Sequence, residues 1–280
     1  MITPVDIKYV LDELNILEGS TIETIFRKGR KILIKTKDND VLISPDTLYL
    51  TTTSKIREID EFAITLRKFL KNKTIESIEQ YGFDKLVIMS FEDKVLILEF
   101  FDGGNCVLCD KSYKIIMPLE FKRINGRNVI AKEDYPFPGI VDLRYITGLK
   151  RILSKGDKLE EALDVILGKY SKEVISLSGL NEDVIVGSLS NGDLERLHSQ
   201  VLNIFSRKKN PQVVFKNKNI VDVLPFDIEP YKDYKKKPFT SFNEALDYFF
   251  SKKESEIVKK TKKKTMKKKI KKRTKKKKKK

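Results

Sequence analysis

The sequence predicts an α+β protein: an antiparallel, sandwich-like β-rich N-terminal domain, then a small helical module and a basic tail. Three observations lead to this fold class. Strand-like runs recur through the first half of the chain at a spacing of roughly 8–12 residues, which is typical of antiparallel sheets. The pattern becomes helical from 159 to 205. Beyond 252 the chain is mostly lysine and too poor in apolar residues to bury a face, so we expect disorder there.

The N-terminal half is expected to open with a helix. Thr3 and Pro4 place an N-cap residue before a proline at the first helical position, and Asp6 stands in the first turn, near the positive end of the helix dipole. A second helix is expected over 57–70, where the apolar residues form one stripe. The expected strands are 21–26, 32–36, 41–50, 74–80, 86–91, 95–101, 105–109 and 113–119. We expect the two helices to pack against the sheets.

The C-terminal half has three parts. Four short helices are expected within 159–205, because Gly- and Asn-containing breaks interrupt the helical pattern. A strand pattern returns over 211–227, with a hairpin turn at Asn217-Lys218-Asn219, and a capping-box pattern at Ser241 opens a last helix. The expected organisation is therefore a β-rich domain (1–150), a helical module (151–208), a hairpin and helix (209–251) and a Lys-rich tail (252–280).

The net charge of +17 is confined to the tail. Segment 252–280 holds 18 Lys and one Arg against two acids, while the rest of the chain holds 38 basic and 38 acidic residues. The body is thus electrically neutral. The cationic tail is expected to bind polyphosphate through counterion release, without sequence preference.

Several classes of protein are disfavoured by composition. No apolar run approaches the roughly 18 residues of a membrane span, and the N-terminus lacks the pattern of a secretory signal. Two cysteines cannot form a disulfide framework, and one histidine makes a His-based catalytic or zinc site improbable. We therefore expect a cytoplasmic protein that has no membrane association and no metal or other cofactor.

The cysteine pair and the single histidine could each indicate a catalytic or metal-binding site. Cys106 and Cys109 form a CxxC, but they lie on an expected strand, where three residues of separation put the thiols on opposite faces. We interpret them as ordinary strand cysteines, and His198 as an ordinary helix residue. No Ser/His/Asp, Cys/His or phosphate-binding glycine motif is visible, so nucleotide hydrolysis and dinucleotide binding lack support.

Two further positions remain open between a structural and a functional reading. Gly179 is either a plain turn or the hinge of a helix–hairpin–helix that contacts phosphate. Asp84 and Lys85 precede a wholly apolar strand, and are either a turn residue and a solvated edge or an acid and a base of one site. The second reading requires both to lie in the turn, because neighbours on a strand point in opposite directions.

Three stretches resemble one known family. The run 66–70, the run 75–87 that contains Gly82-Phe-Asp84-Lys85, and the run 96–110 that contains Asp102-Gly-Gly-Asn-Cys106 resemble the N-terminal domain of the NFACT family, also called fibronectin-binding-protein-A-like. The segments 211–215, 221–226 and 239–249 resemble the part of the family that leads into its coiled coil. The resemblance covers residues 3–255 in order, and is nearest in character to the archaeal branch of the NEMF and RqcH group.

This resemblance implies a factor of ribosome-associated quality control. Such factors bind a large ribosomal subunit obstructed by peptidyl-tRNA, hold an incoming tRNA and, in several lineages, support template-free alanine-type tailing of the nascent chain. The ribosome makes the peptide bond, so the factor is not an enzyme and takes no small-molecule substrate. The resemblance also implies an N-terminal fold similar to formamidopyrimidine-type DNA glycosylases, followed by a helix–two-turns–helix module.

The resemblance also implies site residues. The family's Asp-Arg motif, associated with tRNA engagement, falls on Asp84-Lys85, and an acid of its first helix falls on Asp6. Lys in place of Arg keeps the charge but loses the bidentate fork, which weakens the case for tailing more than for ribosome binding. We add Arg67 and Lys68 to the expected tRNA-binding residues. Gly179 and Lys172 are expected to contact nucleic-acid backbone.

The Lys-rich end departs from the family, whose members continue into a coiled coil and a further domain. Three interpretations are a truncated or frameshifted product, a split system, and a short form that uses the tail as an RNA anchor. Alternative functions are an RNA-binding fragment without tailing activity, a glycosylase-like DNA- or RNA-binding protein and an adhesion protein. The glycosylase reading is disfavoured because Pro4 is internal and is followed by Val5 rather than Glu.

Overall fold

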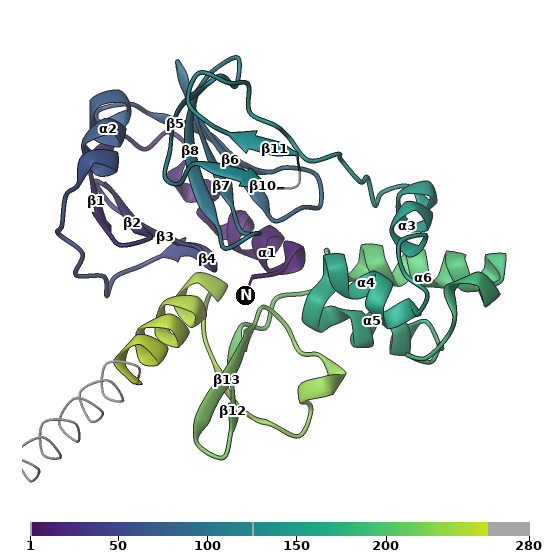
Figure 1. Cartoon of the computed structure of the whole chain (residues 1–280). Coiled ribbons are helices and arrows are strands. Elements are labelled where there is room, and N and C mark those ends of the chain that lie inside the picture. Colours follow the sequence, from purple (N-terminus) through teal and green to yellow (C-terminus); the bar gives the residue numbers. More distant parts are fainter. Residues whose placement is uncertain (1, 125, 257–280) are drawn as a thin grey trace, which may run out of the picture.

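A computed structural model describes residues 2–124 and 126–256 of the chain. Two antiparallel sheets form the N-terminal part (Figure 1). The first has the order β1-β2-β3-β4 and the second the order β5-β6-β7-β8-β9, so each is a simple meander of neighbouring strands. Their bounds are β1 Ile22–Lys28, β2 Lys31–Thr36, β3 Asp40–Ser44, β4 Thr47–Leu50, β5 Ile75–Gln80, β6 Leu86–Phe91, β7 Lys94–Glu99, β8 Asn105–Asp110 and β9 Ile115–Pro118. Together with the helices, these antiparallel sheets confirm the α+β fold class.

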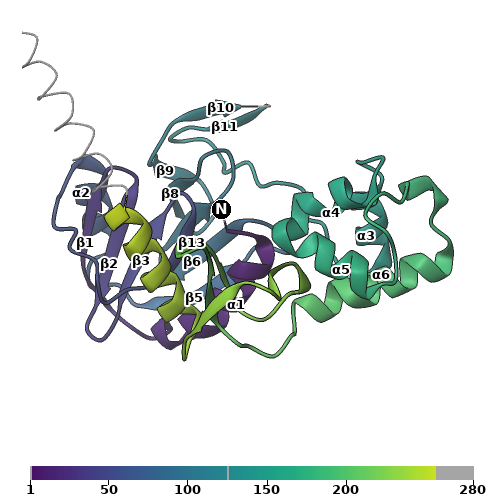
Figure 2. The same ribbon diagram turned by 90° about the horizontal axis from the view of Figure 1, so that it is seen from below.

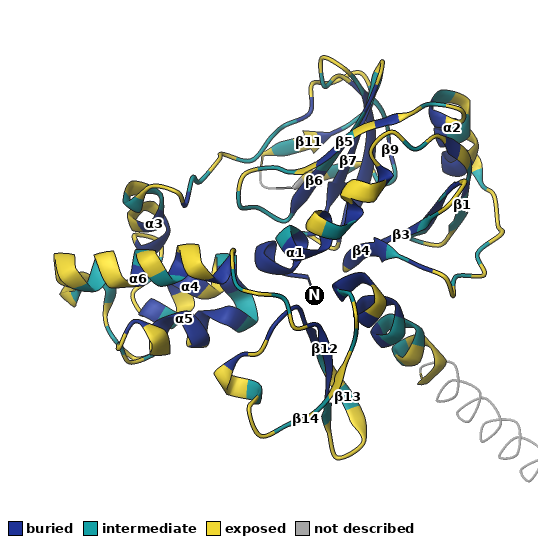
Figure 3. Ribbon diagram, turned by 180° about the vertical axis from the view of Figure 1, so that it is seen from behind, coloured by how far each residue is buried: buried dark blue, intermediate teal, exposed yellow. Residues whose placement is uncertain are grey.

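Two helices accompany the sheets. Helix α1 (Pro4–Leu14) begins with the expected capping box, in which the Thr3 side chain accepts from the Asp6 amide and the Asp6 side chain accepts from the Thr3 amide. Figure 3 shows α1 buried along most of its length. Helix α2 (Glu61–Leu70) packs on β1 and starts later than the expected residue 57, because Asp60 is its N-cap and accepts from the Ala63 amide at 3.0 Å.

The five-stranded sheet is buried on both faces. On β8, Cys106 and Leu108 point into the main hydrophobic core, whereas Val107 and Cys109 point into a second, smaller core. The two cysteines thus lie on opposite faces of the strand, as predicted, and neither forms a disulfide. This two-sided burial explains why these strands are continuously apolar instead of alternating.

A short hairpin, β10 (Lys122–Ile124) and β11 (Arg127–Val129), was not expected from the sequence. Its strands are brief and polar, so they carry no strand pattern. The hairpin is tied to the second core through Arg127, which donates to the buried Glu99 carboxylate at 2.8 Å, while the Tyr135 hydroxyl donates to the same carboxylate at 2.6 Å. The ion pair with the buried Glu99 carboxylate and the burial of Val129 in the second core together hold this hairpin.

The helical module contains α3 (Ile146–Leu153), α4 (Leu159–Leu167), α5 (Ser171–Leu177) and α6 (Asn191–Ile204), with 3-10 turns η2 (Gly168–Tyr170) and η3 (Val186–Ser188). It begins at Ile146, so the boundary expected at 150 falls inside α3. Within 159–205 there are three α-helices and not the four expected. The segment between α5 and α6, where a further helix was expected, is a loop that contains only the 3-10 turn η3.

The last part of the described chain is a hairpin sheet and a helix. Strands β12 (Gln212–Lys216) and β13 (Asn219–Leu224) pair across the expected turn, and β14 (Lys235–Pro238) adds an unexpected edge strand in the order β13-β12-β14. A 3-10 turn, η4 (Glu229–Tyr231), precedes β14. The last helix occupies 242–256 and so extends beyond residue 252, where we expected the Lys-rich tail to begin. The remainder of the expected tail, 257–280, lies outside the described residues.

The N-terminal end of the chain lies where all these parts meet. Figures 1 and 2 show α1 at the centre of the molecule, between the sheets, the helical module and the β12–β13 hairpin. Side chains from every one of these parts join one continuous hydrophobic core. The first residues of α1 are therefore surrounded by segments that are distant in sequence, and the candidate site is built there.

Candidate functional site at the N-terminal joint

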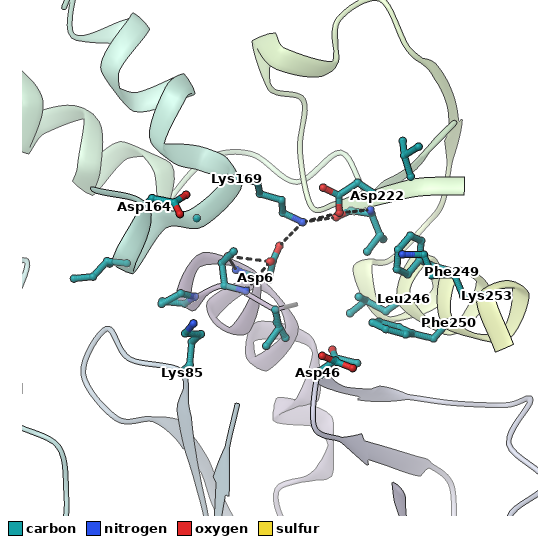
Figure 4. A pocket seen from close by; sticks show the side chains of 18 of the residues that line it. Asp6, Asp46, Lys85, Asp164, Lys169, Asp222, Leu246, Phe249, Phe250 and Lys253 are labelled. Atoms are coloured by element: carbon teal, nitrogen blue, oxygen red, sulfur yellow. Dashed lines mark hydrogen bonds and ion pairs between the residues drawn. The ribbon is translucent and has the colours of Figure 1, made fainter. Parts of the chain in front are cut away.

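An open cavity of about 450 Å³, called here the first cavity, lies at this meeting point (Figure 4). Its walls come from the start of α1, the β3–β4 turn, the end of α4 with η2, β13 and the last helix. The charged side chains that line it are Asp6, Asp46, Lys85, Asp164, Lys169, Asp222 and Lys253. With acids and bases both present and apolar side chains between them, the cavity suits a polar ligand that offers donors, acceptors and an apolar face.

Asp6 lies at the base of this cavity and is only 2% exposed. Its Oδ2 atom accepts from the Thr3 amide and hydroxyl, both at 2.9 Å, and its Oδ1 atom accepts from the Tyr170 hydroxyl at 2.6 Å. Lys169 adds an ion pair at 3.3 Å. Asp6 therefore joins α1 to the helical module, and both carboxylate oxygens already have partners.

Lys169 links this acid to a third part of the chain. Its Nζ atom lies 3.1 Å from an Asp222 carboxylate oxygen on β13 and donates to the Val223 carbonyl at 2.8 Å. Burial disfavours the charged ammonium, but the carboxylates of Asp6 and Asp222 outweigh it, and the pKa of Lys169 is raised. Burial, followed by the nearby Asp6 charge, raises the pKa of Tyr170, which keeps that hydroxyl a donor. We call Asp6, Lys169, Tyr170 and Asp222 the joint cluster.

Asp84 and Lys85 both lie in the turn between β5 and β6, which is the condition that the sequence reading set for a shared site. Lys85 lines the first cavity and points toward the start of α1 (Figure 4). Asp84 lines a second cavity of about 300 Å³, together with Tyr81, Phe83 and Arg151. The two cavities have Pro4, Val165 and Ile166 in common, so they are neighbours along one groove.

The turn is fixed to α1 by a residue that the sequence reading did not single out. The side-chain amide of Gln80 donates to the Pro4 carbonyl at 3.0 Å and to the Asp84 carbonyl at 2.9 Å. The Asp84 carboxylate accepts from the Lys85 amide at 2.6 Å. Asp6, Asp84 and Lys85 are thus held on one rigid frame, although nothing in the spacing of Gln80 signals this role.

Arg67 and Lys68 lie elsewhere. Both belong to α2, and neither lines the two cavities. Arg67 donates from Nε to the Ile25 carbonyl at 2.6 Å, and its guanidinium lies 4.8 Å from the centre of the Phe26 ring, so it serves the packing of α2 on β1. Lys68 is exposed on the same helix. Their expected contact with tRNA remains a prediction about a separate surface.

Gly179 and Lys172 belong to the helical module but also lie outside the two cavities. Gly179 has φ of 70° and ends α5, with the Leu180 amide donating to the Ile175 carbonyl. The next α-helix starts only at Asn191, so Gly179 does not lead directly into a helix N-terminus. Lys172 pairs with Glu160 and Glu182 on the module surface.

The cysteines and the histidine have structural surroundings. Burial raises the pKa of Cys109 to about 12 and that of Cys106 further. His198 lies in α6 with Nε2 2.9 Å from the Leu143 carbonyl oxygen. Residues 2–124 and 126–256 contain no group of three or more His, Cys, Asp or Glu side chains arranged to hold a metal ion. Over the same ranges, no helix combines the length and the apolar character needed to cross a bilayer.

Comparison with known proteins shows the family. The model of the NFACT N-terminal and middle domains matches residues 3–280. The archaeal Rqc2 homolog aRqcH of Methanocaldococcus jannaschii is 29% identical over 92% of this chain and 43% of its own length. The ribosome quality control complex subunit NEMF of Homo sapiens is 26% identical over 90% of this chain and 28% of its own length. The chain thus spans less than half the length of these relatives.

A solved structure from Staphylococcus aureus shares the fold. The fibrinogen binding protein from Staphylococcus aureus covers 89% of this chain, and 98% of its own chain is matched, with 18% identity and a TM-score of 0.71. A Lactococcus lactis Fpg bound to DNA matches 73% of this chain and 78% of its own, with 16% identity and a TM-score of 0.40. The match of the family model over nearly the whole sequence, together with the shared fold, shows that this chain belongs to the NFACT family through its N-terminal and middle domains.

Proposed function

We propose that this chain is an RNA-binding unit of ribosome-associated quality control. It binds a large ribosomal subunit obstructed by peptidyl-tRNA, engages a tRNA in the groove formed by the two cavities, and so supports alanine-type tailing and rescue of the stalled nascent chain. The names of the archaeal and human relatives support the ribosomal role. The groove supports the tRNA part of the proposal.

The observation that carries the proposal is the placement of Asp84 and Lys85 in neighbouring cavities of one groove. A loop of RNA presents phosphates that a lysine can neutralise, base amino groups that a carboxylate can accept from, and base faces that stack on aromatic rings. Lys85, Asp84 and the rings of Tyr81 and Phe83 offer these three kinds of contact within the groove. Asp6 acts indirectly, because its oxygens are already bonded, and positions the groove.

The proposed role is one of binding, with the peptide bond made by the ribosome. Among the described residues that line the two cavities there is no Ser, Cys or His side chain to act as a nucleophile or a near-neutral base. Lys85 offers a point charge instead of the bidentate guanidinium of the family's motif, so its hold on RNA is less directional. RNA binding with weak tailing is the form of the proposal that fits this substitution.

The test compares two double variants of the full chain. Asp84→Ala with Lys85→Ala removes the proposed contacts. Asp93→Ala with Lys94→Ala is the matched control, because Asp93 ends a turn in the same sheet and Lys94 is the first residue of β7. Both variants leave the net charge unchanged, so the Lys-rich tail contributes equally to each.

The readouts are tRNA affinity and co-sedimentation with large subunits that carry peptidyl-tRNA. We expect the Asp84/Lys85 variant to lose about tenfold in tRNA affinity, equivalent to about 1.4 kcal/mol, and the control to bind as the unchanged chain does. Equal binding by both variants would remove the groove from the proposal. A thermal melt of each variant establishes that the fold is retained.

A further inference from the structure

A second cationic surface lies on the C-terminal hairpin sheet and the last helix. We call it the basic ridge and define it by three exposed lysines and two partly exposed aromatic rings: Lys235, Lys237, Lys252, Phe239 and Tyr248. These residues come from β14 with its C-terminal flank and from the last helix. None of the five lines the first or the second cavity.

Contacts between lysines and rings join β14 to the last helix. Lys237 Nζ lies 3.9 Å from the centre of the Tyr248 ring and 4.8 Å from that of Phe239. Lys252 Nζ lies 5.6 Å from the centre of the same Tyr248 ring, so the two lysines share one ring. The Phe239 and Tyr248 rings also contact each other, with their centres 5.2 Å apart. The ridge therefore spans the edge strand and the last helix.

The lysines of the ridge have no acidic partner among the described residues. Lys236, between Lys235 and Lys237 in sequence, points to the other side of β14 and pairs with Asp227 at 2.6 Å. The three ridge lysines form no ion pair within residues 2–124 and 126–256. Their positive charge is uncompensated within the part of the chain that the structure describes.

A simpler explanation accounts for only part of the ridge. Lysines on an edge strand prevent unwanted pairing with a strand of another molecule, and β14 is an edge strand. That role concerns Lys235 and Lys237, which the strand itself carries. It gives no reason for Lys252 on the helix to share the Tyr248 ring with Lys237.

The combination of charge and rings favours RNA over an acidic protein. Unpaired lysines neutralise phosphates, and a contact made by several of them releases counterions without reading sequence. In the free chain Lys237 lies over the Phe239 and Tyr248 rings. When this ammonium moves to a phosphate, the rings become platforms on which unstacked bases can rest, which a partner that offers only carboxylates would not use. From these observations we propose that the basic ridge is a second RNA-binding surface, which holds the sugar–phosphate backbone of ribosomal RNA.

The ridge also has a defined relation to the groove. The last helix lines the first cavity with Leu246, Phe249, Phe250 and Lys253, and it presents Tyr248 and Lys252 to the ridge, on another side of the helix. One helix thus separates the two surfaces. The inference rests on the proposed ribosomal function and assigns a different task to each surface: the groove engages tRNA and the ridge holds the subunit.

Lysine footprinting of the full chain tests the ridge directly. Amine acetylation is read by mass spectrometry for the chain alone, with large ribosomal subunits, and with protein-free RNA extracted from those subunits. We expect the reactivity of Lys235, Lys237 and Lys252 to fall several-fold with both partners. Lys37, Lys55 and Lys71, which are exposed on the N-terminal part, serve as controls and stay reactive. Unprotected ridge lysines would overturn the inference, and so would protection by subunits but not by the extracted RNA, which indicates a ribosomal protein.

A pair of triple variants provides the quantitative test. Lys235→Gln, Lys237→Gln and Lys252→Gln together should lower the slope of log K against log salt concentration for RNA binding by about two to three, since each lost phosphate contact removes about 0.7–0.9. The control triple Lys37→Gln, Lys55→Gln and Lys71→Gln has the same net charge and should change the slope by less than about one. Equal slopes for the two triples contradict the ridge.

The two proposals fail separately. If the Asp84/Lys85 variant keeps full tRNA affinity while the ridge remains protected, only the groove is wrong. If the ridge triple behaves like its control while the Asp84/Lys85 variant loses tRNA affinity, only the ridge is wrong.

Discussion

Asp6 and Lys169 lie 3.3 Å apart, from Oδ1 to Nζ, although one opens the first helix and the other stands in the middle of the helical module. The acid is 2% exposed and the base is held on its other side by Asp222. Removing one partner of a buried ion pair leaves an uncompensated charge, which costs far more than the loss of a surface pair. This asymmetry makes the joint cluster testable by stability measurements.

Asp6→Ala is expected to lower the free energy of unfolding by about 3–5 kcal/mol, because Lys169 and the Tyr170 hydroxyl lose their partner in a buried place. Asp12→Ala is the matched control in the same helix. Asp12 pairs with Lys8 at the surface, and its loss should cost less than about 1 kcal/mol. Denaturant titration of both variants measures the difference, and a similar small loss in each would show that the joint cluster is not stabilising.

The stability of the joint cluster should depend on pH in the alkaline range. The pKa of Tyr170 is raised above its ordinary value of 10.0, so above pH 10 the folded chain holds this proton more tightly than the unfolded chain does. The stabilisation is complete below about pH 10 and is lost as pH rises further, by up to about 1.4 kcal/mol per pH unit. Tyr170→Phe should reduce this slope, whereas Tyr145→Phe, at a residue 65% exposed, should leave it unchanged.

Lys85→Arg is expected to strengthen tRNA binding. The guanidinium restores a fork that can bond two phosphate oxygens or two acceptors of a base edge, which should add about 1 kcal/mol, or roughly fivefold in affinity. Lys94→Arg, at the first residue of β7, should have no effect. The measurement is tRNA affinity of the full chain at fixed salt, and weaker binding by the arginine variant would contradict a role for Lys85 in phosphate or base-edge contact.

The two cysteines are expected to be unreactive in the folded chain. Both are buried, and burial raises the pKa of Cys109 to about 12, so almost no thiolate is present at neutral pH. A thiol reagent should label neither residue until denaturant is added, and should then label both. A cysteine placed at the exposed position Lys37 provides the reactive control. Rapid labelling of the native thiols would contradict the structural role assigned to Cys106 and Cys109.

The regular elements of this fold could be predicted because local signals coincide with long-range packing. Thr3 and Asp6 announce the first helix through its capping box, and the apolar runs of β6, β7 and β8 reflect burial on both faces. The hairpin β10–β11 and the edge strand β14 could not be predicted, since the first is held by a buried ion pair at Glu99 and the second is a row of lysines.

The candidate site was predictable only in part. Asp84 and Lys85 carry a local signal, because they form a charged pair before an apolar strand. The assignment of Asp6 to the site rests on the family resemblance. Tyr170 and Asp222 gave no such signal, because their partners are far away in sequence: Tyr170 lies 164 positions from Asp6. Only the folded chain brings the three parts together, so no pattern within a short window could identify the joint cluster.

The arrangement of Asp6 has a consequence for how the chain is synthesised. The N-terminus leaves the ribosome first, but the buried carboxylate of the first helix stays without its cationic partner until Lys169 has emerged, and that lysine in turn awaits Asp222. The β-rich half therefore lacks the stabilisation that this ion pair provides until the helical module and β13 have been synthesised. A factor proposed to attend interrupted translation would thus depend, for its own maturation, on an uninterrupted passage through more than two hundred codons, from Asp6 to Asp222.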